Sequence, residues 1–122
     1  MKTAKDYIEL IDEEYYVAKK RGFSRFSKEW GIWSSIMNRT LRRRTEGKND
    51  IETIKLKYIF IYWSLMSELL EFHYKYKVSH NKKKEMIREE TRNIKNIILT
   101  GDGLQPLSEE ELVARLLKGT LK

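Results

Sequence analysis

The sequence predicts an all-α protein that forms one small domain of 122 residues. Two observations lead to this fold class. Most long segments repeat apolar residues every three or four positions, which is the spacing of one helical face. The segments between them are short and polar, and no internal repeat divides the chain. We expect a single domain over residues 1–122, with a core over residues 7–65 and a helical extension over residues 66–122 that is a candidate dimerisation region.

The first expected helix covers residues 4–21. Acidic residues precede its middle, basic residues lie at its end, and Gly22 is a typical stop signal. Its apolar residues form one stripe, which consists of Tyr7, Ile8, Ile11, Tyr15 and Ala18.

Residues 24–44 predict two helices separated by a tight turn at Gly31. Ser24 opens a short helix to about Trp30, and a third helix begins at Ser34 or Ser35 and ends near Arg44. The inward-pointing residues around the turn would be Phe26, Trp30 and Ile32. In the third helix, the packed side would hold Ile36, Met37, Thr40 and Leu41, and the exposed side would hold Ser35, Asn38, Arg39 and Arg42.

Residues 46–50 are a polar turn with Gly47, and Asn49 or Asp50 can cap the helix that follows. Residues 51–77 keep a helical spacing of apolar side chains, which predicts one long, largely buried, apolar helix. Residues 54–58 and 74–78 also alternate with period two, so a strand remains an alternative there. No glycine or proline interrupts the segment to form a hairpin, and this favours the helix.

Two C-terminal helices follow a basic connection over residues 79–84. The first carries Ile87, Thr91, Ile94 and Ile98 and ends at Gly101. After a loop over residues 101–106, Ser108 and Glu111 match a capping box. A short helix with four apolar residues then runs to Gly119, and these are Leu112, Val113, Leu116 and Leu117.

The net charge of +7 comes from 25 Lys and Arg against 18 Asp and Glu, and the excess lies between Lys19 and Lys48. A basic surface attracts polyanions, because neutralising phosphates releases bound counterions. A solvated lysine-rich surface is the alternative interpretation.

The chain has no cysteine, so it has neither disulfides nor a thiolate for catalysis or zinc, and a cytoplasmic setting is expected. Its first residues are charged, which argues against a secretion signal. The longest apolar stretch, residues 56–72, is too short and too polar for a membrane span, so no membrane partner is expected.

The sequence does not predict an enzyme. His73 and His80 lack partners at a recognised metal-binding spacing, and Glu46 and Lys48 lie in an expected turn rather than on a strand beside a second carboxylate. No phosphate-binding glycine loop, nucleophile elbow or serine triad is present, so no catalytic, cofactor-binding or metal site is predicted.

The order of elements over residues 7–65 resembles the helix-turn-helix of the lambda repressor and Cro class of DNA-binding proteins. In that class a glycine precedes the reading helix and an aliphatic residue six positions later anchors it, which matches Gly31 and Met37. Ser27 stands four positions before the glycine, where a small residue is usual. The resemblance implies that Ser34, Ser35, Asn38, Arg39 and Arg42 face the major groove, and that Arg25, Lys28, Arg43, Arg44 and Lys48 contact phosphates.

Trp33 flanks this basic face and is a further candidate nucleic-acid contact, whereas the positions of Trp30 and Trp63 in apolar stripes indicate core packing. We therefore expect a sequence-recognising protein that binds double-stranded DNA as a homodimer, without a cofactor. Its size and charge fit a small regulator or a factor of a phage or mobile element. The alternative is a helical protein-interaction module or inhibitor whose basic surface binds an acidic or nucleic-acid-binding site of a larger protein partner, and RNA binding is a third possibility.

Overall fold

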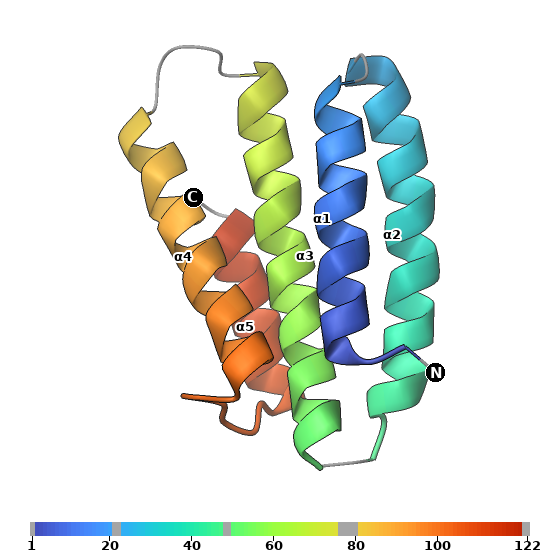
Figure 1. Cartoon of the computed structure of the whole chain (residues 1–122), viewed down its shortest axis with the longest axis vertical. Helices are drawn as coiled ribbons and strands as arrows, with labels where there is room; N and C mark the ends of the chain where they lie inside the picture. Colours follow the sequence, from blue (N-terminus) through green and yellow to red (C-terminus); the bar gives the residue numbers. More distant parts are fainter. Residues whose placement is uncertain (1, 21–22, 48–49, 76–80, 121–122) are drawn as a thin grey trace.

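The computed structural model of the chain describes residues 2–20, 23–47, 50–75 and 81–120. Within the helices, the side chains of residues 23–29, 33–34, 74–75, 81 and 116–120 lie outside this description. Five helices and no strand occur in the described part, which confirms the all-α class. The helices stand side by side with their long axes roughly aligned (Figure 1). None of the described helices combines the length and the apolar character that a bilayer crossing requires.

Helix α1, Ala4–Lys20, follows the stripe predicted for it. Its N-terminus is closed by a reciprocal pair of hydrogen bonds that the sequence analysis did not anticipate. The Asp6 backbone N–H donates to the Thr3 hydroxyl (3.2 Å), and the Thr3 backbone N–H donates to the Asp6 carboxylate (2.8 Å). These bonds favour the ionised carboxylate, and they hold the pKa of Asp6 below its ordinary value.

Helix α3, Ile51–Lys75, is the centre of the bundle and packs against all four other helices. It is a single helix, so the strand alternative for residues 54–58 is wrong, and residues 76–78 lie outside the described residues. Asp50 caps it, because the Thr53 N–H donates to the Asp50 carboxylate (2.8 Å). Apolar side chains are buried around most of the circumference of α3, and one narrow polar strip, formed by Lys57, Ser64, Glu68 and Glu71, stays at least partly exposed.

Helix α2, Phe23–Thr45, runs without a break through Gly31, so the predicted turn at Gly31 is wrong. Ser35 does not begin a new helix. Its hydroxyl donates to the Gly31 carbonyl (3.1 Å), one turn back within the same helix. In one continuous helix, Trp30, Met37 and Leu41 fall on the same face, and all three are buried.

The continuous helix also reverses three predicted orientations, those of Ile32, Ile36 and Thr40. Ile32 and Ile36 were expected to pack inward, but they lie on the outer face and are 55% and 57% exposed. Thr40 is exposed as well, and its hydroxyl donates to the Ile36 carbonyl (3.0 Å). The side chain of Phe26 lies outside the described residues.

Helices α4, Asn81–Thr100, and α5, Glu109–Thr120, follow at the C-terminal end. Gly101 ends α4 with a positive φ of 80°, and its N–H donates to the Ile97 carbonyl (2.9 Å). Ser108 caps α5 through a bond from the Glu111 N–H (3.1 Å), which confirms the serine half of the predicted capping box. The helix includes Gly119, so the stop predicted there is wrong.

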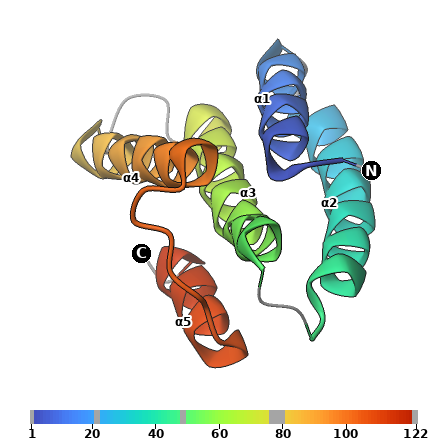
Figure 2. The same ribbon diagram turned by 60° about the horizontal axis from the view of Figure 1, so that its bottom comes forward.

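Helix α5 packs against α3 alone among the described helices. The loop before it is fastened to α3 by three hydrogen bonds, one of which runs from the Gln105 backbone N–H to the Tyr58 hydroxyl (3.3 Å). Lys57 donates to the Leu107 carbonyl (3.2 Å), and the Tyr58 hydroxyl donates to the Gln105 carbonyl (3.3 Å). In Figure 2, α2 and α5 lie on opposite flanks of α3 and do not meet.

Candidate nucleic-acid interface

The exposed basic side chains of the C-terminal half of α2 form the candidate interface. Arg39, Arg42 and Arg43 are exposed, and none of these three forms an ion pair with another described side chain. The sequence from Trp30 to Thr45 contains no acidic residue. The negative end of the helix dipole favours cations in the last turn, which accounts for part of this clustering but not for Arg39, which lies more than one turn from the helix end.

The centre of the exposed face differs from the predicted one. Successive helical residues are about 100° apart, so Ile32, Ile36, Arg39 and Arg43 lie within an arc of about 60° on the outer side. We call these four residues the outer stripe. Ser35 and Arg42 are exposed beside it, whereas Asn38 is half-buried and turns toward α5.

Arg44 is occupied by contacts within the fold. Its guanidinium donates to the Lys2 carbonyl and lies 5.9 Å from the centre of the Tyr7 ring. These contacts tie the end of α2 to the start of α1. The remaining predicted site residues, Arg25, Lys28, Trp33, Ser34 and Lys48, have side chains outside the described residues.

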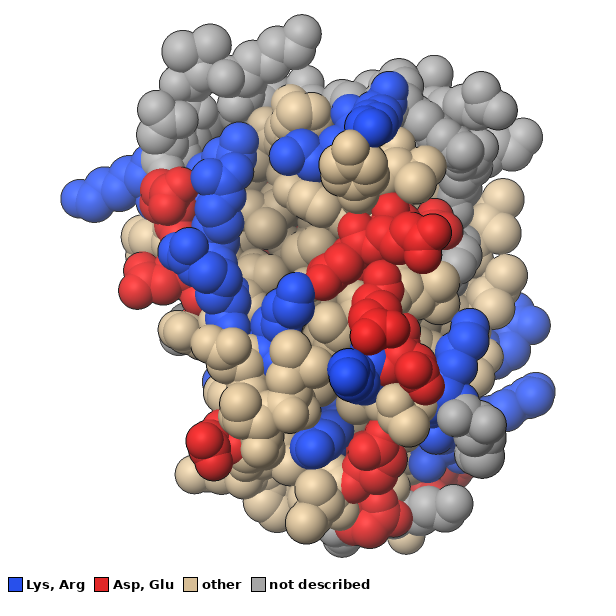
Figure 3. Space-filling model, viewed as in Figure 1, with Lys and Arg blue, Asp and Glu red and all other residues tan. Residues whose placement is uncertain are grey.

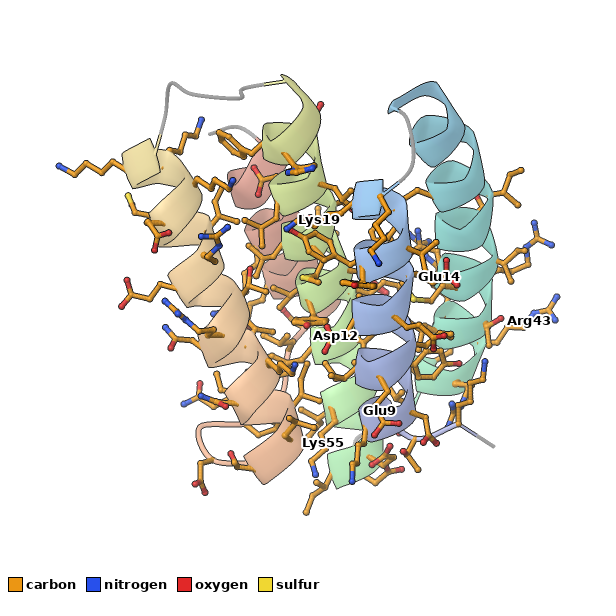
Figure 4. The ribbon with its side chains drawn as sticks, turned by 45° about the horizontal axis from the view of Figure 1, so that its top comes forward. Glu9, Asp12, Glu14, Lys19, Arg43 and Lys55 are labelled. Atoms are coloured by element: carbon orange, nitrogen blue, oxygen red, sulfur yellow. The ribbon has the colours of Figure 1, made fainter. Side chains whose placement is uncertain are left out.

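The charge on the neighbouring helix restricts how a polyanion can approach. Acidic side chains gather over α1, between basic side chains of α4 and of the lower part of α2 (Figure 3). Asp6, Glu9 and Glu13 are exposed on α1. Arg43 points away from this acidic helix, as Figure 4 shows. A phosphate backbone would therefore meet α2 from its outer side and avoid α1.

A groove of about 600 Å³ lies on the other side of α2, where α3 forms its floor and α5 its second wall. Phe60 and Leu112 contribute buried apolar surface, and Val113 is exposed at the rim. Its charges are mixed, because Arg42 and Lys57 are basic and Glu46 and Glu109 are acidic. Such a lining does not favour a uniformly negative ligand, in contrast to the outer stripe.

A partly buried polar network joins α1, α3 and α4, away from the outer stripe and from the groove. The Tyr62 hydroxyl donates to Asp12, and Lys95 donates to the same carboxylate at 2.7 Å. Burial of Tyr62, and secondly its bond to Asp12, raises the pKa of its phenol above the ordinary value. Each polar group has a partner inside the bundle, so the network acts as a structural clamp.

Trp30 and Trp63 form a second internal contact, as their positions in the sequence indicated. The two rings stack with centroids 4.0 Å apart and an angle of 11° between their planes. The Trp30 indole N–H donates to the Ser67 hydroxyl at 2.9 Å. Both rings are buried, so neither is placed to stack on a nucleic-acid base.

Sequence reasoning missed the apolar half of the outer stripe and the whole groove. The phase of Trp30, Met37 and Leu41 was the signal for the first, because these residues share a face only if Gly31 is helical. The groove has no sequence signal, since it joins side chains from three elements. No family model, curated protein or solved structure matches the chain in comparisons of its sequence and fold.

Proposed function

We propose that the protein binds double-stranded DNA through the exposed basic side of α2 and acts as a small regulator by binding. The observation that supports this is the pair of exposed arginines Arg39 and Arg43, which form no ion pair with a described side chain and lie on a stretch of helix without acids, whereas Arg42 lines the groove. Arginine binds phosphate and guanine edges bidentately. An α-helix with its side chains is about 10–12 Å wide, which fits the major groove of about 12 Å.

This binding mode uses α2 as a single helix at the edge of the bundle. It needs no turn at Gly31 and no second helix across the backbone. One helix makes few base contacts, so most of the affinity would come from phosphates and would depend strongly on salt.

The experiment is a titration of a duplex of random sequence with the purified protein at several salt concentrations. Arg39→Ala and Arg43→Ala should each lower the slope of log affinity against log salt by about one, because each removes one phosphate contact. If Arg39 also reads a base, its loss should cost roughly 1–3 kcal/mol and relax sequence preference. Arg92→Ala, an exposed arginine on α4, is the matched control and should leave both quantities unchanged.

A parent protein that does not bind duplex at low salt would contradict the proposal. A protein partner would then be the better explanation of the basic surface. Equal effects of the Arg39 and Arg92 variants would show that net charge, rather than the outer side of α2, determines binding.

We also propose that the functional unit is a symmetric dimer joined at the groove. The groove presents apolar surface beside two basic side chains, Arg42 and Lys57, and two acidic side chains, Glu46 and Glu109. A surface of mixed sign can be self-complementary about a two-fold axis, because the basic part of one copy faces the acidic part of the other. Dimerisation would double the number of phosphate contacts that one helix can make.

A further inference from the structure

The apolar half of the outer stripe takes no part in the core that the described residues form. Ile32 and Ile36 lie one turn apart on the outer side of α2 and are more than half exposed. Neither belongs to the buried core. Single exposed apolar residues are common on protein surfaces, but these two share a narrow arc with two arginines, Arg39 and Arg43, that make no ion pair with a described side chain.

A ligand that covers this stripe must offer methyl groups or other apolar surface next to negative charge. The DNA major groove does so, because the C5-methyl of thymine projects into it between two phosphate backbones. The minor groove offers no methyl group. Double-stranded RNA has uracil in place of thymine and a deep, narrow major groove that does not admit a helix.

We propose that Ile32 and Ile36 read thymine methyl groups, so that the protein prefers A·T-containing DNA and discriminates it from duplex RNA. This inference rests on the proposed DNA binding, and it adds the base chemistry that the site recognises. Arg39 and Arg43 lie one to two turns further along the same stripe. The two arginines would bind the phosphate backbone of the DNA while the two isoleucines contact the thymine methyl groups. Covering a methyl group with an isoleucine side chain removes apolar surface from water, which provides the discrimination.

The test compares two duplexes of one A·T-rich sequence, of which the second carries deoxyuridine in place of every thymine. This change removes only the methyl groups and leaves base pairing and phosphate charge intact. The parent should bind the thymine duplex more tightly by about fourfold for each methyl group covered, which is the factor for transferring one methylene-sized group out of water. An RNA duplex of the same sequence should bind more weakly than either.

The variants Ile32→Ala and Ile36→Ala should each reduce the difference between the thymine and deoxyuridine duplexes, and the double variant should abolish it. Their salt slopes should equal that of the parent, because no charge is lost. Their melting temperatures should stay close to the parent value, since both side chains are exposed. Leu99→Ala on α4, another exposed apolar residue, is the matched control and should keep the discrimination.

The possible failures are distinguishable. A parent that binds both DNA duplexes equally would overturn methyl reading and leave DNA binding in place. Discrimination that survives in the double variant would also overturn it. If the unmodified protein binds neither DNA duplex, the proposed DNA binding itself is contradicted. A parent that sediments as a dimer while the double variant sediments as a monomer would assign the stripe to a second copy of the chain and overturn the inference.

Discussion

At the scale of single residues, Gly31 lies at an open position on the surface of α2, where a side chain would fit without a clash. A Cβ added at this position would meet nothing within 4 Å, and the backbone there is helical without a positive φ. Gly101 differs, because its φ of 80° belongs to the region that side-chain-bearing residues rarely adopt.

Replacing Gly31 with alanine should therefore stabilise the protein by about 1 kcal/mol, since alanine loses less backbone entropy in a helix. Gly101→Ala is the control and should destabilise it by about 1 kcal/mol or more. Urea unfolding of both variants measures these changes. A loss of stability in the Gly31 variant would mean that this position does not tolerate a helical alanine, contrary to the continuous α2.

The buried phenol of Tyr62 gives the protein a defined response to alkaline pH. Its pKa is raised above the ordinary value of 10.0 in the folded state, so the native protein keeps a proton that the unfolded chain loses. The stabilising contribution is complete below pH 10 and falls as the pH rises, by up to about 1.4 kcal/mol per pH unit. Tyr62→Phe should flatten this decline.

The measurement is the unfolding free energy of parent and variant at several pH values around and above the ordinary tyrosine pKa. At neutral pH the variant should lose about 1 kcal/mol, the typical value of one hydrogen bond. Parallel pH curves for the two proteins would contradict the assignment of the alkaline response to Tyr62. The pKa of Tyr15 is also raised by burial, so a residual slope is expected in both.

At the scale of helices, local signals determined most boundaries correctly. Asp50, Gly101 and Ser108 lie where the sequence predicted helix ends, because a cap needs only its own side chain or φ angle and the adjacent backbone. Gly31 was misread because a glycine before two serines is equally compatible with a turn and with an exposed helical position. Burial against α3 decides between these two, and burial depends on residues distant in the sequence.

The same reasoning explains the outcome for the candidate site. Exposure of Arg39 and Arg42 was predictable, since charged side chains seldom lie in a core. The orientation of Ile36 was not, because an apolar residue in a helix is expected to pack inward. The groove depends on the position of α5 relative to α2, which no local pattern specifies.

Helix α5 should contribute to stability and assembly rather than to recognition of DNA. Glu109, Glu110 and Glu111 in its first turn would repel phosphate. Deleting residues 108–122 uncovers α3, so the melting temperature should fall, while the outer stripe remains intact. Calorimetry and duplex titration of the shortened chain measure the two effects. A shortened protein that still folds and dimerises but no longer binds duplex would contradict this division of roles.

At the scale of the whole molecule, the two surfaces of α2 serve different partners in our proposal. The outer stripe is free for DNA, and the groove side is free for a second copy. The predicted oligomer can be tested without DNA, because the groove contains no part of the outer stripe.

Val113→Glu should convert the dimer to a monomer by placing a charge at the exposed rim of the groove. The bundle itself should be unaffected, because the side chain is 48% exposed. Sedimentation velocity at high micromolar concentration measures the state of the parent and the variant. Leu99→Glu on α4 is the control and should remain dimeric. A parent that is monomeric at every concentration, with and without duplex, would contradict the dimer.

The central position of α3 also sets the order in which parts of the molecule can open. Among the described residues, every other helix packs on α3, whereas α5 packs on no helix besides α3. Detaching α5 therefore breaks one interface, but opening α3 breaks all four. Amide protons of α3 should exchange with solvent only when the entire chain unfolds. Those of α5 should exchange through a partial opening that costs less free energy than global unfolding. The molecule can thus release its last helix transiently and keep the scaffold that holds α2 in place.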